Sequence, residues 1–130
     1  MKRLLCGFAL CALLMACAES MEDKAERECQ EFTRKFCPTP YVNNERTDSQ
    51  VFYRDTKTVT YYRTLRGDAD NLPAIEANKA KLHEVLREGL SRNTSLKPYK
   101  EAGFRVRFVY RSASDSAVVL YEDSFDLKDL

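Results

Sequence analysis

The side chains best suited to nucleophilic chemistry are two cysteines and the single histidine. Cys29 or Cys37 could attack a substrate as a thiolate if His83 took the thiol proton. His83 is far from both cysteines along the chain, so this pairing requires a tertiary contact. The histidine also fits a half-buried structural role at the edge of an apolar helix stripe. A small Cys/His enzyme is therefore the alternative hypothesis, and no catalytic residue is assigned.

Metal and cofactor sites have no recognisable motif in the sequence. There is no second histidine and no Cys-x-x-Cys pair. A Gly-rich phosphate loop, a G-x-S-x-G elbow and an H-E-x-x-H helix are also missing. Neighbouring Glu122 and Asp123 would point to opposite faces of a strand, so they cannot form an acid/base pair. We therefore expect no metal ion and no cofactor.

A row of arginines is the second chemical pattern. Arg105, Arg107 and Arg111 are interleaved with aromatic residues, as in single-strand nucleic-acid binders. The charge argues against that class: loss of residues 1–16 would remove Lys2 and Arg3, leaving 19 of 21 basic residues against 20 acidic ones. We expect no nucleic-acid partner. Planar guanidinium groups suit a carboxylate, a phosphate or a sulfated glycan instead.

Another cysteine, Cys17, follows a segment with the properties of an export signal. Residues 1–3 include two basic side chains, residues 4–16 are apolar, and a small residue directly precedes the cysteine. The apolar run is shorter than the roughly twenty residues of a transmembrane helix. Residues 14–17, Leu-Met-Ala-Cys, resemble the lipobox of bacterial lipoproteins. The resemblance implies a signal peptide removed before Cys17 and acylation of Cys17, with palmitate among the chains; the alternative is an ordinary secretory peptide.

The resemblance to lipoproteins also implies a location. Three acyl chains exceed the two signals that stable anchoring requires, so the membrane partner would be held through Cys17. Ala18 stands where many lipoproteins of the inner membrane carry an aspartate. We therefore expect a lipid-anchored protein of the cell envelope, in the outer membrane of a Gram-negative cell, with the leaflet left open.

Maturation would leave two cysteines free to pair. An exported compartment favours a disulfide between Cys29 and Cys37. In one continuous helix, however, their Cα atoms would lie about 12 Å apart, beyond the limit of about 7 Å for a bridge. The bond would need the helix to end before Cys37 and turn back, so free thiols are favoured.

Apolar periodicity predicts two amphipathic helices. The first spans about residues 21–36, with a stripe formed by Met21, Ala25, Cys29, Phe32 and Phe36. The second spans about residues 74–92, with Asp70 or Asn71 as the N-cap and Pro73 in the first turn. Gly89 in its stripe would permit close approach to a sheet or begin the helix end. Residues 91–102 are expected to form a connector.

Alternating patterns predict two β-hairpins. In the first, residues 51–54 and 58–65 flank a three-residue turn, with Arg54 opposite Thr58 and odd-numbered residues in the core. In the second, residues 104–111 pair with residues 117–125. Arg111 opposite Ala117 would set Phe108 against Leu120 in the core, with Arg105 against Asp123 and Arg107 against Tyr121 on the other face.

The order of these elements predicts the fold class and the domains. Helix, hairpin, helix, hairpin gives an α+β fold, a two-layer αββαββ sandwich with a four-stranded, mainly antiparallel sheet and both helices on one face. The strand order stays open. Residues 1–16 are the predicted signal peptide, residues 17–21 a lipidated tether, and residues 22–130 one domain.

Two further segments carry a second resemblance. Residues 37–49 and 96–104 are similar to sequence segments of short, uncharacterised envelope lipoproteins, some of which carry a threonine synthase label. The residues do not support that label, because a pyridoxal-phosphate enzyme needs a Schiff-base lysine and a phosphate-cradling loop. The favoured function is a binding or accessory module for a protein, peptide or glycan of the envelope. The alternatives are an enzyme using Cys29 or Cys37 with His83, and a purely structural role.

Overall fold

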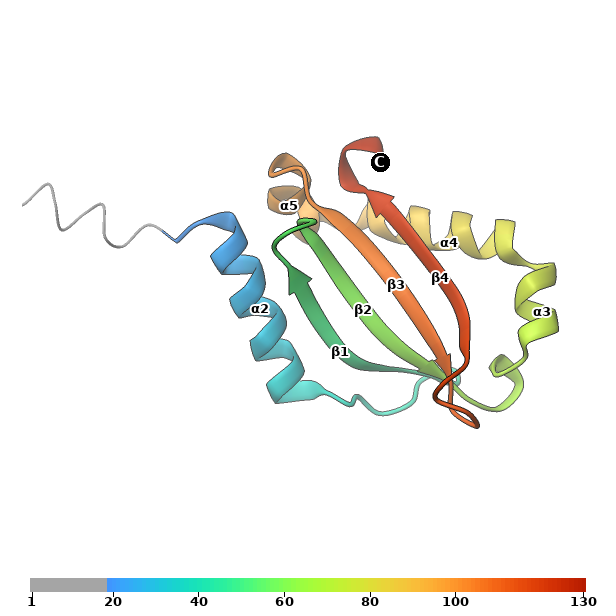
Figure 1. Ribbon diagram of the computed structural model, residues 1–130. Helices are drawn as coiled ribbons and strands as arrows, with labels where there is room; N and C mark the ends of the chain where they lie inside the picture. Colours follow the sequence, from blue (N-terminus) through green and yellow to red (C-terminus); the bar gives the residue numbers. More distant parts are fainter. Residues whose placement is uncertain (1–18) are drawn as a thin grey trace, which may run out of the picture.

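The computed structural model describes residues 19–130, so the predicted signal peptide and the predicted acylation site, Cys17, lie outside the described residues. The helices are α2 (Met21–Phe36), α3 (Leu72–Ala77), α4 (Lys79–Arg92) and α5 (Lys97–Glu101), and the strands are β1 (Glu45–Tyr53), β2 (Thr58–Leu65), β3 (Arg105–Ser112) and β4 (Val119–Asp126) (Figure 1). Short 3₁₀ turns cover Gly67–Ala69, Thr94–Leu96 and Leu127–Asp129. Within residues 19–130, none of the helices has the length and apolarity needed to cross a membrane.

The strands form one four-stranded sheet in the order β1-β2-β3-β4. The two outer pairs are antiparallel and the central pair β2–β3 is parallel. A parallel pair needs a crossover connection, and residues 66–104, with α3, α4 and α5, supply it. Ala25 of α2 and Leu90 of α4 join one core with Phe108 of the sheet. The predicted α+β class, with both helices on one face, is confirmed.

Helix α2 has the predicted bounds because both of its ends are capped. The Ser20 side chain accepts a hydrogen bond from the Asp23 N–H at 3.1 Å, and the Cys37 N–H closes the last turn on the Thr33 carbonyl at 3.1 Å. Ala25 and Cys29 are buried against the sheet. Phe36 at the end of the stripe is exposed, so only part of the predicted apolar stripe contributes to the core.

The second predicted helix is two helices, α3 and α4, separated at Asn78. The Asn71 side chain caps α3 by accepting from the Ala74 N–H at 3.1 Å, as predicted. Asn78 leaves helical geometry, with φ −120° and ψ 17°, and its side-chain amide donates to the Ala74 carbonyl at 2.7 Å. An asparagine that hydrogen-bonds its own backbone competes with the helix, which explains the break.

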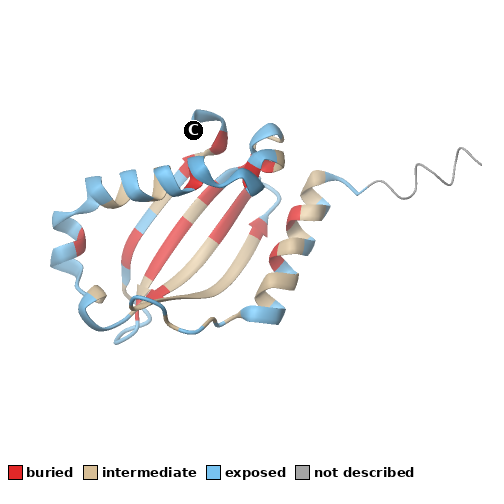
Figure 2. Ribbon diagram, turned by 180° about the vertical axis from the view of Figure 1, so that it is seen from behind, coloured by how far each residue is buried: buried red, intermediate tan, exposed pale blue. Residues whose placement is uncertain are grey.

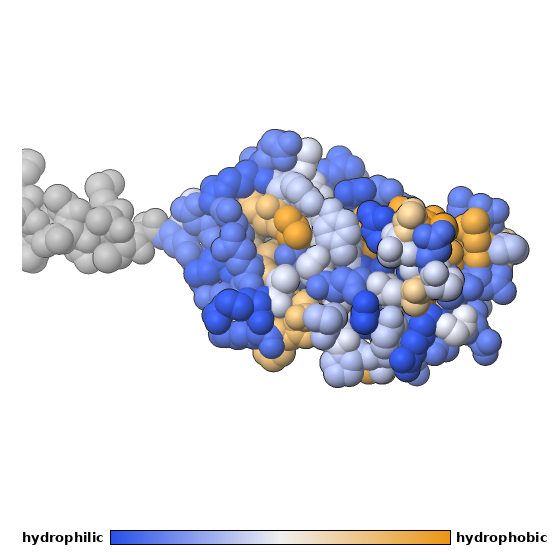
Figure 3. Space-filling view, turned by 60° about the horizontal axis from the view of Figure 1, so that its bottom comes forward, coloured by the Kyte–Doolittle hydropathy of each residue, from blue (hydrophilic) through white to orange (hydrophobic). Residues whose placement is uncertain are grey.

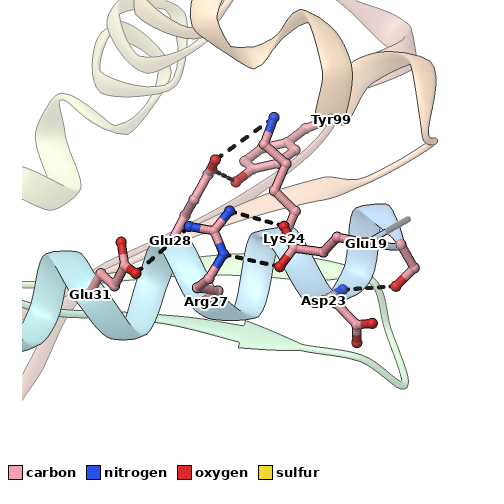
Figure 4. A network of polar contacts seen from close by, with 8 residues as sticks. Glu19, Asp23, Lys24, Arg27, Glu28, Glu31 and Tyr99 are labelled. Carbon is pink, nitrogen blue, oxygen red and sulfur yellow. Dashed lines mark hydrogen bonds and ion pairs between the residues drawn. The ribbon is translucent and has the colours of Figure 1, made fainter. Parts of the chain in front are cut away.

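The prediction that residues 91–102 form a plain connector is wrong, because α5 lies there. Pro98 occupies its first turn, where the missing N–H costs nothing. Tyr99 is buried, and its hydroxyl donates a hydrogen bond to Glu28 of α2 (Figure 4). Arg27 of α2 binds Glu19, which precedes the helix, through Nε at 3.0 Å and Nη2 at 2.9 Å. Helix α5 therefore attaches α2 to the crossover.

The predicted register of the first hairpin is wrong by one residue. Tyr53, rather than Arg54, pairs with Thr58, and Phe52 lies opposite Val59. The turn spans residues 54–57, with Lys57 at a positive φ of 51°, so it is one residue longer than predicted. Phe52 is buried, and its ring centroid lies 5.0 Å from that of Phe104. Packing of this phenylalanine selects the even-numbered face of β1.

The second hairpin also differs in register. Phe108 lies opposite Asp123 and Tyr110 opposite Tyr121. A bulge then makes Arg111 pair with Val119, leaving Leu120 as the extra residue. The bulge lets adjacent Leu120 and Tyr121 both be buried, which simple alternation does not predict. The predicted core face of β3 is confirmed, since Val106, Phe108 and Tyr110 are buried, as is Phe104 directly before the strand.

Candidate functional site

A hollow with a largely apolar lining lies between α3, α4 and the core face of the sheet. It has a volume of about 630 Å³, and a second hollow of about 370 Å³ shares Arg63, Val85 and Leu86 with it. We call the two together the α4 groove. Its apolar lining includes Leu65, Ile75, Leu82, Val85, Leu86 and Leu90. Figure 3 shows hydrophobic side chains at the surface on the side of the molecule where α3 lies.

The groove is open because α4 buries little of its apolar face. Leu90 is buried, but Val85 is 58% exposed and Leu82 and Leu86 are only partly buried. Figure 2 shows α4 crossing the sheet with most of its residues exposed or intermediate. Burying a valine or leucine fully contributes about 1.5–3 kcal/mol. A partner that covered this face would gain much of that free energy.

Gly89 faces the same groove. A Cβ atom at Gly89 would meet nothing within 4 Å, so the predicted close approach to the sheet is wrong. The residue lies near the end of α4, as the other interpretation expected. A glycine here costs about 1 kcal/mol relative to alanine, and packing within residues 19–130 does not require it.

Arg63 holds a fixed positive charge on the groove floor. Its Nη1 donates to the Tyr110 hydroxyl at 2.9 Å and pairs with Glu45 at 3.0 Å. The guanidinium lies 5.1–5.8 Å from the ring centroids of Tyr61, Phe108 and Tyr110. Its Nε is buried and has no hydrogen-bond partner among the described residues. Burial raises the pKa of Tyr110, so its hydroxyl stays protonated.

A second polar cluster connects α4 to β4. One oxygen of Asp123 lies 2.7 Å from His83 Nδ1 and accepts a hydrogen bond from the Tyr121 hydroxyl at 2.7 Å. The His83 ring stacks on Phe125 with 4.8 Å between ring centroids. Burial, followed by the bond to Asp123, raises the pKa of Tyr121. The predicted half-buried position of His83 agrees with the structure, although its partner could not be predicted.

The cysteines and the histidine are not brought together. Cys29 packs on the β1 side through α2, whereas His83 stacks on β4. These strands lie at opposite edges of the sheet, about 14 Å apart at the usual strand spacing. Burial raises the pKa of the Cys29 thiol to about 11 and also raises that of Cys37. Both thiols are free, and this geometry does not support a Cys/His nucleophile.

The predicted arginine row lies on the opposite face of the sheet. Arg107 binds Glu122 through Nε at 2.7 Å and Nη2 at 2.5 Å, and Arg111 donates to the Ser116 carbonyl at 3.3 Å. Arg105 is exposed. The predicted pairing of these side chains with Asp123 and Tyr121 is wrong because the hairpin register differs. Arg63 faces the groove instead, because it lies opposite core-facing Tyr110 of β3, whereas even-numbered Thr58 and Thr60 lie opposite Arg105 and Arg107.

The described residues offer no metal centre. Across residues 19–130, no three His, Cys, Asp or Glu side chains come together in a way that could hold a metal ion. The site that sequence reasoning missed is the α4 groove itself. Two features of the sequence hinted at this groove. Arg63 interrupts the apolar residues on the core face of β2, and Gly89 interrupts the apolar stripe of α4.

Comparisons with known proteins identify a family and a shared fold. The model of a family described as a domain of unknown function, DUF8479, matches residues 20–121. No curated protein matches the chain by sequence. The crystal structure of a proposed secreted protein from Pseudomonas aeruginosa has a TM-score of 0.64 and 10% identity, covering 84% of this chain and 96% of that one. A pilotin from the Vibrio vulnificus type 2 secretion system has a TM-score of 0.54 and 13% identity, covering 82% and 88%.

Proposed function

The chain belongs to the DUF8479 family, and we propose that it is a lipid-anchored accessory module of the bacterial envelope that binds a protein partner through the α4 groove. The fold is shared with a proposed secreted protein and with a pilotin of a type 2 secretion system. These likenesses support an accessory role in the envelope. The proposal that the partner is a protein depends on the apolar lining of the α4 groove.

The single observation that carries the proposal is the exposed apolar face of α4. Leu82, Val85 and Leu86 form an apolar wall of the groove. On its floor Arg63 binds Tyr110 and Glu45, with only its Nε left without a partner among the described residues, and Tyr121 binds Asp123. A glycan would need many free donors and acceptors, whereas the part of the groove lining that α4 supplies is mainly apolar. An apolar segment of a protein needs only apolar surface, so it is the occupant that fits.

The proposed anchor constrains where this partner lies. Helix α2 begins at Met21, so only residues 17–20 would separate an acylated Cys17 from the folded domain. At about 3.5 Å per residue, that tether reaches roughly 14 Å. The domain would therefore stay next to the membrane surface, and its partner would be a protein that presents an apolar segment there.

The anchor is tested by the intact mass of the protein purified from cell membranes. We expect an acylated species that begins at Cys17, and a Cys17→Ala variant that lacks the lipid mass and leaves the membrane fraction. A wild-type mass without lipid would contradict the anchor. It would leave the groove proposal standing, because the groove depends only on residues 19–130.

The partner is tested by site-specific photo-crosslinking in intact cells. A crosslinker at Lys81, which lines the groove, should capture one protein that a crosslinker at the exposed Asp55 of the β1–β2 turn does not capture. The same protein captured from both positions would indicate non-specific contact, and no capture from Lys81 would argue against a protein in the groove. Either result would contradict the proposal.

A further inference from the structure

Another hollow, separate from the α4 groove, lies on the face of the sheet that α2 and α4 leave uncovered. Its volume is about 620 Å³. Thr58 of β2 lies opposite Arg105 of β3, and Thr60 lies opposite Arg107. Arg107 in turn lies opposite Ser124 of β4. Since residues two apart on a strand share a face, short hydroxyl side chains form the floor and the two arginines border it.

The Thr60 hydroxyl on this floor is not satisfied by the protein. Thr60 has 0% exposure, and its Oγ1 has no hydrogen-bond partner among residues 19–130. The neighbouring Thr58 hydroxyl differs, since it donates to the Thr56 carbonyl at 3.1 Å. A buried polar atom without a partner destabilises a fold, and each such atom in a native structure requires an explanation.

The arginines of the hollow have unused donors. Arg105 forms no ion pair with any carboxylate of the described residues. Glu122 occupies Nε and Nη2 of Arg107, and Nη1 has no acceptor in that part of the chain. The ion pair fixes the plane of the Arg107 guanidinium, because two of its nitrogens bind one carboxylate. Arg111, on the same face, is not among the lining residues.

We propose that this hollow is a binding site for one oxyanion group, with Arg105 and Arg107 as charged donors and the Thr60 hydroxyl as a neutral donor. Asp55 also lines the hollow, and Glu122 already offsets one arginine. The two carboxylates offset the two arginines, so the net local charge is near zero. Such a site accommodates a monoanionic carboxylate better than a dianionic phosphate. The site is separate from the α4 groove and does not depend on the proposed function.

The proposal is tested by NMR titration of the purified protein at constant ionic strength. The probes are sodium glucuronate, sodium phosphate and sodium sulfate, with chloride as the reference anion. We expect saturable shifts of the Thr60, Arg105 and Arg107 amides, with glucuronate tightest. Arg105→Gln should weaken binding by at least about fivefold, because it removes a charge-assisted hydrogen bond. Arg111→Gln, a matched loss of charge on the same face, should change affinity by less than about twofold.

The hydroxyl is tested by Thr60→Val, which keeps the shape of the side chain. We expect a higher Tm, because the unpartnered hydroxyl is removed, together with weaker binding of glucuronate. Wild-type affinity in this variant would contradict the role of Thr60. Equal losses in Arg105→Gln and Arg111→Gln, or no saturable shift with any probe, would overturn the site.

Discussion

Arg63 Nη1 donates a 2.9 Å hydrogen bond to the hydroxyl oxygen of Tyr110 on the floor of the α4 groove. The two residues lie opposite each other on the parallel strands β2 and β3. This bond, with the ion pair to Glu45, stabilises a partly buried charged side chain beside the apolar residues of the groove. Apart from Arg63 Nε, the polar groups of the groove floor thus bind one another, whereas the apolar side chains of α4 remain partly exposed.

Removing the Tyr110 hydroxyl should destabilise the protein modestly. Tyr110→Phe keeps the ring over the guanidinium but leaves Arg63 Nη1 with Glu45 alone. We expect the free energy of unfolding to fall by about 0.5–1.5 kcal/mol in urea denaturation. The control is Tyr62→Phe, which removes an exposed hydroxyl contact with Tyr53 and should cost less. If both variants lost the same free energy of unfolding, the bond between Arg63 and Tyr110 would not stabilise the groove floor.

Gly89→Ala should stabilise the free protein. Its Cβ would meet nothing within 4 Å, and alanine is better in a helix by about 1 kcal/mol. The contrasting variant is Gly103→Ala. Gly103 has φ +76°, a region that costs an L-residue about 1–2 kcal/mol, so this variant should be less stable. A loss of stability in Gly89→Ala would mean that the groove is closed in solution.

The thiol of Cys29 should make stability fall at alkaline pH. Burial raises its pKa to about 11 in the folded protein, from an ordinary value near 9. A raised pKa means that folding favours the protonated thiol, so this contribution is complete below pH 9 and is lost as the pH rises towards 11. The stability advantage of the wild type over Cys29→Ala should shrink across that window in urea denaturation. A constant difference would contradict the burial of this thiol.

Asp70 should titrate below the usual range for aspartate. Hydrogen bonds from the side chains of Ser112 and then Ser114 lower its pKa, so its contribution to stability is present above pH 4 and is lost as the pH falls through the folded-state value. In Ser112→Ala the carboxyl should titrate at a higher pH than in the wild type, as followed by NMR. An unchanged titration would show that this bond is absent in solution.

Local patterns predicted the elements that local interactions determine. The bounds of α2 follow from its apolar stripe and from Ser20, and the core face of β3 follows from strict alternation. The Asn71 cap was predictable for the same reason. The registers were not, because the extra turn residue Arg54 and the bulge at Leu120 each change which side chains face the core. Apolar periodicity predicted one continuous helix, but Asn78 leaves helical geometry and separates α3 from α4.

The candidate site was harder to predict because it arises from missing packing. The stripe of α4 predicts a buried face, and only the structure shows that Val85 is left exposed. The contact between His83 and Asp123 joins residues on different elements. The contacts of Arg63 depend on strand order as well as alternation, because its partner Tyr110 lies on β3. Each of these features depends on how the helices and strands pack together, which local sequence patterns do not specify.

The central claim, that the α4 groove binds a protein through apolar contact, is tested most directly by one crosslinking comparison. With the photo-crosslinker at Lys81, the yield of the partner adduct is measured in Val85→Asp and in Val119→Asp, which places the same charge at an exposed valine of β4. We predict that Val85→Asp loses most of the adduct while Val119→Asp keeps it. An undiminished adduct in Val85→Asp would contradict the claim.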